Sequence, residues 1–312
     1  MGDQLHMKRS AGDPFHVRLE VPVAGGALRV ARSGPPPSEA DFVVLAVHGV
    51  TASHVAWRAV ARAVSVRTGA CVLAPDLRGR GGSAELPRPY GFASHVDDLT
   101  SVLDHSGVER AAVVGHSMGA HVVARFASER PDRVVAVVLL DGGLPMPAAA
   151  HVNEDTPSAS AALDARMERS CRTADEYLLG WRQHPAFARA WDDDVAAYAR
   201  YDMAHDGGAV RCVVSEEAVI ADTYDLLFDG VTRNAVRAIR RPLRLMCAAR
   251  GPMDDASVVI PRDHLDAFAA DHPHLQIEHV ADTNHYTLVI GAGPGPSRVA
   301  DAIARVMRDG AR

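Results

Sequence analysis

One ten-residue stretch, Ala111 to Ala120, constrains the fold more than any other part of the chain. A valine-rich apolar run leads into Gly115-His116-Ser117-Met118-Gly119, and a helical pattern begins directly after Ser117. A strand that becomes a helix within one residue forces that residue into a strained backbone conformation. Its neighbours must be glycines, because the two backbones nearly touch. The stretch therefore predicts a strand, a sharp turn and a helix, with the Ser117 hydroxyl exposed above the strand.

The predicted helix start also has a chemical consequence. The first turn of a helix has free backbone N–H groups and the positive end of the helix dipole. Both features suit an attacking serine oxygen and the negative charge that develops on a carbonyl oxygen. The alternative is a glycine-rich turn without chemistry, so the assignment depends on partners elsewhere in the chain.

Strand and helix patterns alternate along most of the sequence. The first two strands, joined at Gly25-Gly26, alternate as half-exposed antiparallel strands do, and the later ones are buried apolar runs. This order predicts an α/β fold: a mostly parallel, twisted sheet covered by helices on both faces. The predicted strands are His16–Val23, Ala27–Ala31, Phe42–Val47, Cys71–Ala74, the run from Ala111, Val134–Leu140, Leu243–Ala249 and Leu275–Val280. The predicted helices are Ser53–Arg67, Ser94–His105 (with Ser94 as its cap), Ser117 to about Arg130, Arg262–Ala270 and Ser297–Arg308.

The alternation stops between about Leu144 and Ala238. This segment has no strand signal, and it contains eight of the sixteen aromatic residues. We interpret residues 144–238 as a helical cap, or lid, inserted between two parts of the core, residues 1–143 and 239–312. Most of its aromatic residues are expected to pack the cap itself, and Asp192-Asp193-Asp194 is expected to be a solvated face. Residues 1–14 are expected to form a flexible arm.

Composition excludes several classes of function. With 312 residues, 47% hydrophobic and 23% charged, the chain is long enough for a substantial core, and its net charge of −6 gives no basic face for nucleic acid or anionic lipid. The sixteen histidines and four cysteines fall in no metal-ligand spacing, so we expect no metal and no cofactor. No apolar run is long enough to span a bilayer, and no signal core precedes residue 14. These features favour a cytoplasmic protein whose partner is a small-molecule substrate; they leave the oligomeric state open.

A serine hydroxyl needs a base within hydrogen-bond reach, and that base needs an orienting partner. His285 follows the last predicted strand, and Asp254 follows the strand before it. Parallel strands would bring both loops to the same edge of the sheet as Ser117. Asp255 and Asp141 are the alternative acids, since one adjoins Asp254 and the other ends the strand after Ser117.

Several motifs, taken together and in order, resemble the α/β-hydrolase family. Gly115-His116-Ser117-Met118-Gly119 resembles its nucleophile elbow. Four further stretches resemble its oxyanion loop, the loop after its fourth strand, its acid motif and its terminal histidine motif: His48-Gly49-Val50, Pro75 to Ser83, Gly251-Pro252-Met253-Asp254 and Asp282-Thr283-Asn284-His285. The resemblance implies Ser117 as nucleophile, His285 as general base and acid, and Asp254 as the favoured acid. Asp141 matches a placement found in some relatives.

The resemblance also implies an oxyanion hole made of backbone N–H groups, which we assign to Val50 and Met118. Losing either side chain would not remove the N–H group. His48 is expected to hold the oxyanion loop by a hydrogen bond, and His116 to support the site from behind rather than act as a base.

Serine at the elbow indicates acyl transfer, since relatives that open epoxides or displace halides have aspartate there. The favoured hypothesis is a serine hydrolase that cleaves a carboxylic ester or lactone of a small, mostly apolar substrate through an acyl-enzyme. A carbon–carbon hydrolase of diketone compounds is the alternative. A third hypothesis is a ligand-binding protein that keeps the fold without the chemistry.

Overall fold

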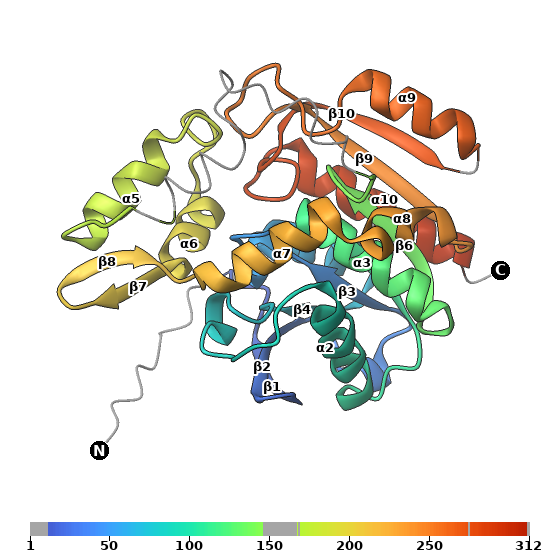
Figure 1. Ribbon diagram of the computed structural model, residues 1–312, viewed down its shortest axis with the longest axis horizontal. Coiled ribbons are helices and arrows are strands. Elements are labelled where there is room, and N and C mark those ends of the chain that lie inside the picture. The colour runs from blue at the N-terminus through green and yellow to red at the C-terminus, as the bar shows by residue number, and fades with distance from the viewer. Residues whose placement is uncertain (1–11, 146–166, 168, 274, 311–312) are drawn as a thin grey trace.

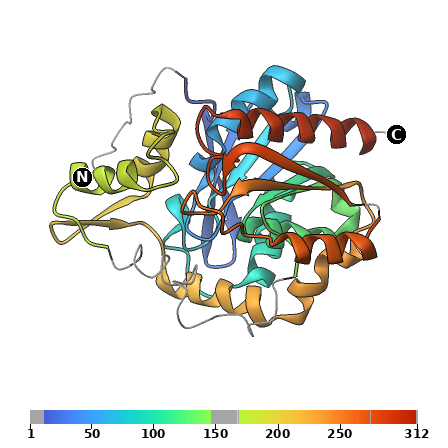
Figure 2. The same ribbon diagram turned by 90° about the horizontal axis from the view of Figure 1, so that it is seen from above.

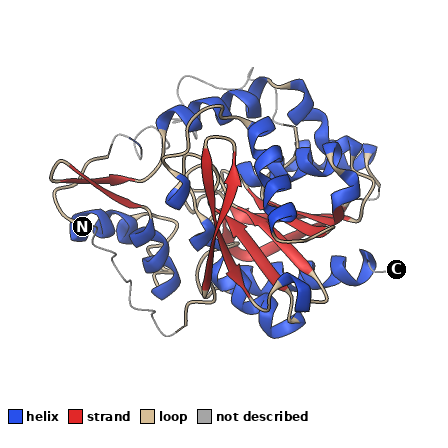
Figure 3. Cartoon of the chain, turned by 90° about the horizontal axis from the view of Figure 1, so that it is seen from below, coloured by secondary structure: helices blue, strands red, loops and turns tan. Residues whose placement is uncertain are grey.

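A single eight-stranded sheet forms the centre of the protein (Figure 3). The computed structural model describes residues 12–145, 167, 169–273 and 275–310. The strands follow the order β1-β2-β4-β3-β5-β6-β9-β10, and the pairings from β4 to β10 are all parallel. The antiparallel pairs described within this sheet are β1–β2 and β2–β4, so the predicted mostly parallel sheet is confirmed. The strands are β1 Val17–Val23, β2 Gly26–Ser33, β3 Val43–Val47, β4 Cys71–Pro75, β5 Ala111–His116, β6 Val134–Leu140, β9 Leu243–Arg250 and β10 Gln276–Asn284.

Helices cover both faces of this sheet, as predicted (Figure 2). Side chains that alternate along each strand divide the core into two clusters: Val44 and Ala46 of β3 enter one, and Leu45 and Val47 enter the other. Helices α1 and α10 pack into the first cluster, and α2, α3, α8 and α9 into the second. The helices are α1 Arg58–Thr68, α2 Phe92–His105, α3 Met118–Glu129, α8 Gly230–Ala238, α9 Arg262–Asp271 and α10 Pro294–Gly310. None of the helices in the described part of the chain is both long and apolar enough to cross a membrane.

The start of α2 differs from the prediction. The helix begins at Phe92 rather than Ser94, after Gly91 at φ 99°. The carboxylate of Asp225, far away in the sequence, accepts a hydrogen bond of 2.8 Å from the Phe92 N–H. A distant side chain thus satisfies a free N–H group that sequence reasoning assigned to a local capping residue.

The segment predicted to be a cap, residues 144–238 and called the cap segment below, follows β6 and precedes β9 in the chain, and part of it projects at the left of Figure 1. The prediction that it has no strands is wrong, because β7 and β8 form a two-stranded antiparallel sheet. Gly207 and Gly208 connect them with φ values of 55° and 89°, so this glycine pair was the missed signal. The elements are α5 Ala174–Gln183, α6 Asp193–Tyr201, β7 Met203–Asp206, β8 Ala209–Cys212 and α7 Glu216–Phe228, with α8 completing the segment against α3. The predicted arm at residues 1–11 and the cap residues 146–166 lie outside the described residues.

The aspartate triplet attaches the cap segment to the core. Asp194 is 7% exposed and accepts hydrogen bonds from Arg58 Nε at 3.0 Å and Arg62 Nη1 at 2.9 Å. Asp192 caps α6 through the Val195 N–H. The expectation of a solvated acidic face is therefore wrong for Asp194, which two arginines from the core reach, whereas Asp193 is exposed.

Candidate active site

The turn at Ser117 has the strained geometry that the sequence predicts. Strand β5 ends at His116, α3 begins at Met118, and Ser117 lies between them at φ 57° and ψ −123°. A Cβ atom on Gly115 would lie 2.1 Å from the Gly119 carbonyl oxygen, and one on Gly119 would lie 2.3 Å from the Val47 oxygen. Side chains at either position would therefore separate the helix from the strands. The glycines hold Ser117 at the carboxyl edge of the sheet.

His285 is paired with Asp141. Its Nδ1 atom lies 2.7 Å from Asp141 Oδ2, and the carboxylate can only accept, so Nδ1 has the proton. Asp141 directly follows β6 and is 1% exposed. Its Oδ1 atom also accepts from the Ala248 N–H at 3.2 Å. With Nδ1 protonated, Nε2 of a neutral imidazole is left as the basic atom.

The expected pair between His285 and Asp254 is not formed. Asp254 Oδ1 accepts hydrogen bonds from Arg250 Nε at 2.7 Å and Asn284 Nδ2 at 2.9 Å. Burial opposes ionisation of Asp254, but these two donors outweigh it and lower the pKa of the carboxyl group. Asp255, the second candidate, accepts from the Ser257 N–H.

The strand register explains why Asp141 is the partner. His116 and Leu140 are aligned in β5 and β6, and the Ser117 N–H donates to the Leu140 carbonyl at 2.9 Å. Asp141 is thus the residue next to Ser117 on the neighbouring strand. A Cβ atom on Gly142 would lie 2.4 Å from the Ser117 carbonyl oxygen, which shows how closely the two backbones pass.

The loop that holds His285 is fixed from two sides. His116 Nε2 donates to the His285 carbonyl at 2.8 Å, and the two rings lie 4.6 Å apart. Asn284 donates to the Ala186 carbonyl of the cap segment at 3.0 Å, and its own oxygen accepts from the Tyr286 and Thr287 N–H groups. Sequence reasoning missed Asn284; the signal was an amide side chain directly before the histidine.

The pKa of His116 agrees with a supporting role. Burial, with a smaller contribution from the neighbouring His285, lowers its pKa well below the usual value. The hydrogen bond to the His285 carbonyl requires the proton on Nε2, and the lowered pKa leaves Nδ1 of the ring unprotonated.

His48 holds the oxyanion loop, His48 to Val50, by two hydrogen bonds. The Leu77 N–H donates to His48 Nε2 at 3.0 Å, so Nδ1 has the proton and donates to the Gly49 carbonyl at 2.8 Å. Burial lowers the pKa of His48 to about 4, which keeps the ring neutral in this tautomer. A Cβ atom on Gly49 would lie 3.2 Å from Ser117 Cβ, so the loop passes directly against the serine.

Each of the two residues assigned to the oxyanion hole follows a residue of the close contact between Gly49 and Ser117. Met118 is the first residue of α3, where N–H groups lack intrahelical partners, and Val50 follows Gly49. Within the described residues, neither N–H group donates a backbone hydrogen bond outside the regular elements. The Met118 side chain is buried and that of Val50 is half-buried.

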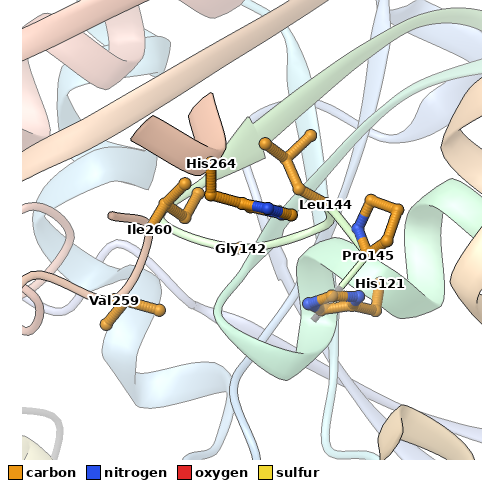
Figure 4. A pocket seen from close by; sticks show the side chains of 7 residues that line it. All are labelled: His121, Gly142, Leu144, Pro145, Val259, Ile260 and His264. Atoms are coloured by element: carbon orange, nitrogen blue, oxygen red, sulfur yellow. The ribbon is translucent and has the colours of Figure 1, made fainter. Parts of the chain in front are cut away.

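The segment that follows Asp141 in the chain lines a small cavity (Figure 4). Its volume of about 20 Å³ is room for about one water molecule. His121, one turn past Ser117 on α3, faces it, and burial lowers the pKa of that histidine to about 4. The residues that line the cavity are His121, Gly142, Leu144, Pro145, Val259, Ile260 and His264.

Among the described residues, two buried cysteines and two buried arginines have the features of structural rather than reactive side chains. Burial raises the pKa of Cys71 to about 11 and that of Cys247 to about 12, so neither is a thiolate nucleophile at neutral pH. Arg78 and Arg80 form buried ion pairs with Asp98 and Asp222. Between residues 12 and 310, with the gaps stated above, no three His, Cys, Asp or Glu side chains are grouped to hold a metal ion.

Comparison with known proteins identifies the family. A sequence model of the α/β hydrolase fold matches residues 43–292. The chain belongs to the α/β hydrolase fold family. Lipase LipV of Mycobacterium tuberculosis is 38% identical over 114 residues, which cover 36% of this chain and 41% of that protein. Uncharacterized protein Rv2715 of the same species is 35% identical over 120 residues, 38% of this chain and 32% of the relative, so the match spans about a third of that relative's length.

Solved structures share the fold over nearly the whole chain. The thioesterase domain from the curacin biosynthetic pathway has a TM-score of 0.71 at 20% identity, covering 92% of this chain and 99% of that one. E-2-(acetamidomethylene)succinate hydrolase has a TM-score of 0.73 at 18% identity, covering 94% and 99%. At these sequence identities the similarity shows a shared fold alone.

Proposed function

We propose that this protein is a serine hydrolase that cleaves a carboxylic ester or lactone through an acyl-enzyme. Ser117 is the nucleophile, His285 the general base and then acid, and Asp141, in place of the favoured Asp254, the orienting acid. The hydrogen bond between His285 Nδ1 and Asp141 Oδ2, beside a serine at φ 57°, is the observation that supports this most strongly. The pair leaves Nε2 available to accept the serine proton.

The reaction would proceed in two halves. The Ser117 oxygen attacks the carbonyl carbon as its proton passes to His285 Nε2, and Asp141 stabilises the imidazolium. The Val50 and Met118 N–H groups bind the oxygen that becomes negative, a contribution on the order of a few kcal/mol to the barrier. His285 then protonates the leaving alcohol, and water activated by the same nitrogen releases the acid. Among the described residues no hydrogen bond is made to the Ser117 hydroxyl, and catalytic hydrogen bonds of this kind commonly tighten when substrate binds.

A named relative supports the choice of an ester or lactone, and the cap segment supports an apolar substrate. One relative, 38% identical over 114 residues, is named a lipase. The cap segment also brings aromatic side chains toward the histidine loop: Trp181 lies 6.4 Å from Tyr286, whose ring lies 5.5 Å from His285. Aromatic side chains beside the histidine loop favour a small, mostly apolar substrate. Most of the cap aromatics, including Trp181, Phe187 and Tyr198, pack against one another.

The test is turnover of p-nitrophenyl butyrate by the purified protein and by Ser117→Ala. We expect turnover in the first and none above background in the second, with unchanged circular dichroism. A fluorophosphonate probe should label the wild type and leave Ser117→Ala unlabelled. Retained turnover in Ser117→Ala would contradict the proposal, and an unlabelled, inactive wild type would favour a binding protein. If the protein cleaves a vinylogous diketone faster than any ester, the bond that it cleaves is a carbon–carbon bond and the alternative hypothesis replaces the ester hydrolase.

A further inference from the structure

Arg80 lies under the oxyanion loop with its whole side chain inaccessible to solvent. Its Nε atom donates to the Val50 carbonyl at 2.9 Å, and its Nη1 atom donates to the Arg78 carbonyl at 3.0 Å. Nη1 also lies 2.6 Å from Asp222 Oδ2. A planar guanidinium can hold these three acceptors at fixed angles, which an ammonium group cannot do.

The contact with Val50 matters because it orients a peptide next to the reacting serine. In a trans peptide the C=O and N–H groups point in opposite directions. His48 Nδ1 holds the Gly49 carbonyl, and this fixes the direction of the Val50 N–H on the other side of the same peptide. Arg80 holds the next carbonyl, that of Val50, so the residue that supplies the N–H group is fixed at both of its peptides.

The guanidinium of Arg80 also contacts the cap segment, through Asp222. Asp222 is on α7 and is fully buried. Its carboxylate contacts Arg80 on one side and the Nε2 atom of His95, on α2, at 3.0 and 3.1 Å on the other. Burial opposes ionisation of Asp222, but His95 and Arg80 outweigh it and lower its pKa. The carboxylate is therefore held ionised opposite the guanidinium.

We propose that Arg80 is a positioning residue for the oxyanion hole and that Asp222 links helix α7 of the cap segment to it. The inference rests on the proposed function, because it assigns a role within the same site. Arg80 touches no reacting atom and acts through the Val50 backbone. A change at Arg80 should therefore weaken binding of a tetrahedral adduct more than binding of the flat ester.

Arg78 provides a matched comparison in the same loop. It is 1% exposed and makes a bidentate ion pair with Asp98 at 2.8 and 2.7 Å. Its remaining donors reach the Pro87 and Ala24 carbonyls, away from the oxyanion loop. Replacing either arginine by lysine keeps the charge and costs buried hydrogen bonds. Only Arg80→Lys removes the hydrogen bond that the Val50 carbonyl accepts from Arg80 Nε.

The experiment compares Arg80→Lys with Arg78→Lys. For each, kcat and KM are measured with p-nitrophenyl butyrate, and inhibition is measured with butylboronic acid, whose boron accepts the Ser117 oxygen and becomes tetrahedral. For Arg80→Lys we expect kcat to fall and the boronate Ki to rise together, on the order of tenfold to a hundredfold, with KM changed less than about threefold. For Arg78→Lys, kcat and Ki should stay within about threefold of wild type, even if thermal stability falls.

Asp222→Asn is the second variant, since it keeps an acceptor for Arg80 and removes the charge. It should move kcat and Ki in the same direction by a smaller factor. The inference is overturned if Arg80→Lys or Asp222→Asn folds and keeps wild-type kcat and Ki, or if Arg78→Lys loses as much as Arg80→Lys. Failure of the proposed function is a separate outcome, seen as Ser117→Ala retaining turnover.

Discussion

His285 and Asp141 are 144 positions apart in the sequence, and their Nδ1 and Oδ2 atoms lie 2.7 Å apart. The contact joins the loop after β10 to the end of β6, the strand next to the serine strand. Asp254, in the loop after β9, instead binds Asn284, the residue before the histidine. One carboxylate thus orients the imidazole, and the other helps to hold its loop.

The two aspartates should differ sharply when each is made neutral. In Asp141→Asn the single amide oxygen can keep the bond from the Ala248 N–H, which turns the NH2 group toward His285 Nδ1 and disfavours the Nδ1–H tautomer. We therefore expect kcat to fall on the order of 10³- to 10⁴-fold. Asp254→Asn weakens one hydrogen bond to Asn284, and the loss should stay below about tenfold. Initial rates with p-nitrophenyl butyrate measure both. An Asp254→Asn variant with the larger loss would restore Asp254 as the acid.

The elbow glycines provide a second prediction. A Cβ atom on Gly119 would meet the Val47 and His48 carbonyl oxygens at 2.3 and 2.5 Å, so Gly119→Ala should destabilise the fold by more than about 3 kcal/mol. Gly230, at the start of α8, has nothing within 4 Å of the same atom. Gly230→Ala should change the unfolding free energy by less than about 1 kcal/mol. Urea unfolding compares them, and equal costs would refute the steric argument.

The fold could be predicted from the sequence because its signals are local. Buried strands such as Val134–Leu140 are continuous apolar runs, and the turn at Ser117 is defined by its own glycines. The acid could not be chosen, because that choice depends on strand order and on competing donors. Nothing near Asp254 in the sequence shows that Asn284 is its hydrogen-bond partner.

The same limit applies to the capping of the N-terminus of helix α2. Asp225, on α7, accepts from the Phe92 N–H, whereas sequence reasoning selected Ser94. Asp225→Ala should therefore lower the free energy of unfolding by about 1 kcal/mol. Ser94→Ala should change it by less than about 0.5 kcal/mol. Thermal unfolding measures the stability of the two variants, and a larger loss of stability in Ser94→Ala would favour Ser94 as the capping residue.

The buried histidines predict how stability responds to acid. An unfolded histidine binds a proton below about pH 6.5, but burial lowers the pKa of His121 to about 4 in the folded protein. Between these values the unfolded state binds more protons, so stability falls as pH falls, by about 2 kcal/mol from pH 7 to pH 5 for one such group. His121→Gln should reduce the difference between urea unfolding free energies at pH 7 and pH 5 by about that amount, whatever its effect at pH 7. An unchanged difference would show that His121 is protonated in the folded state.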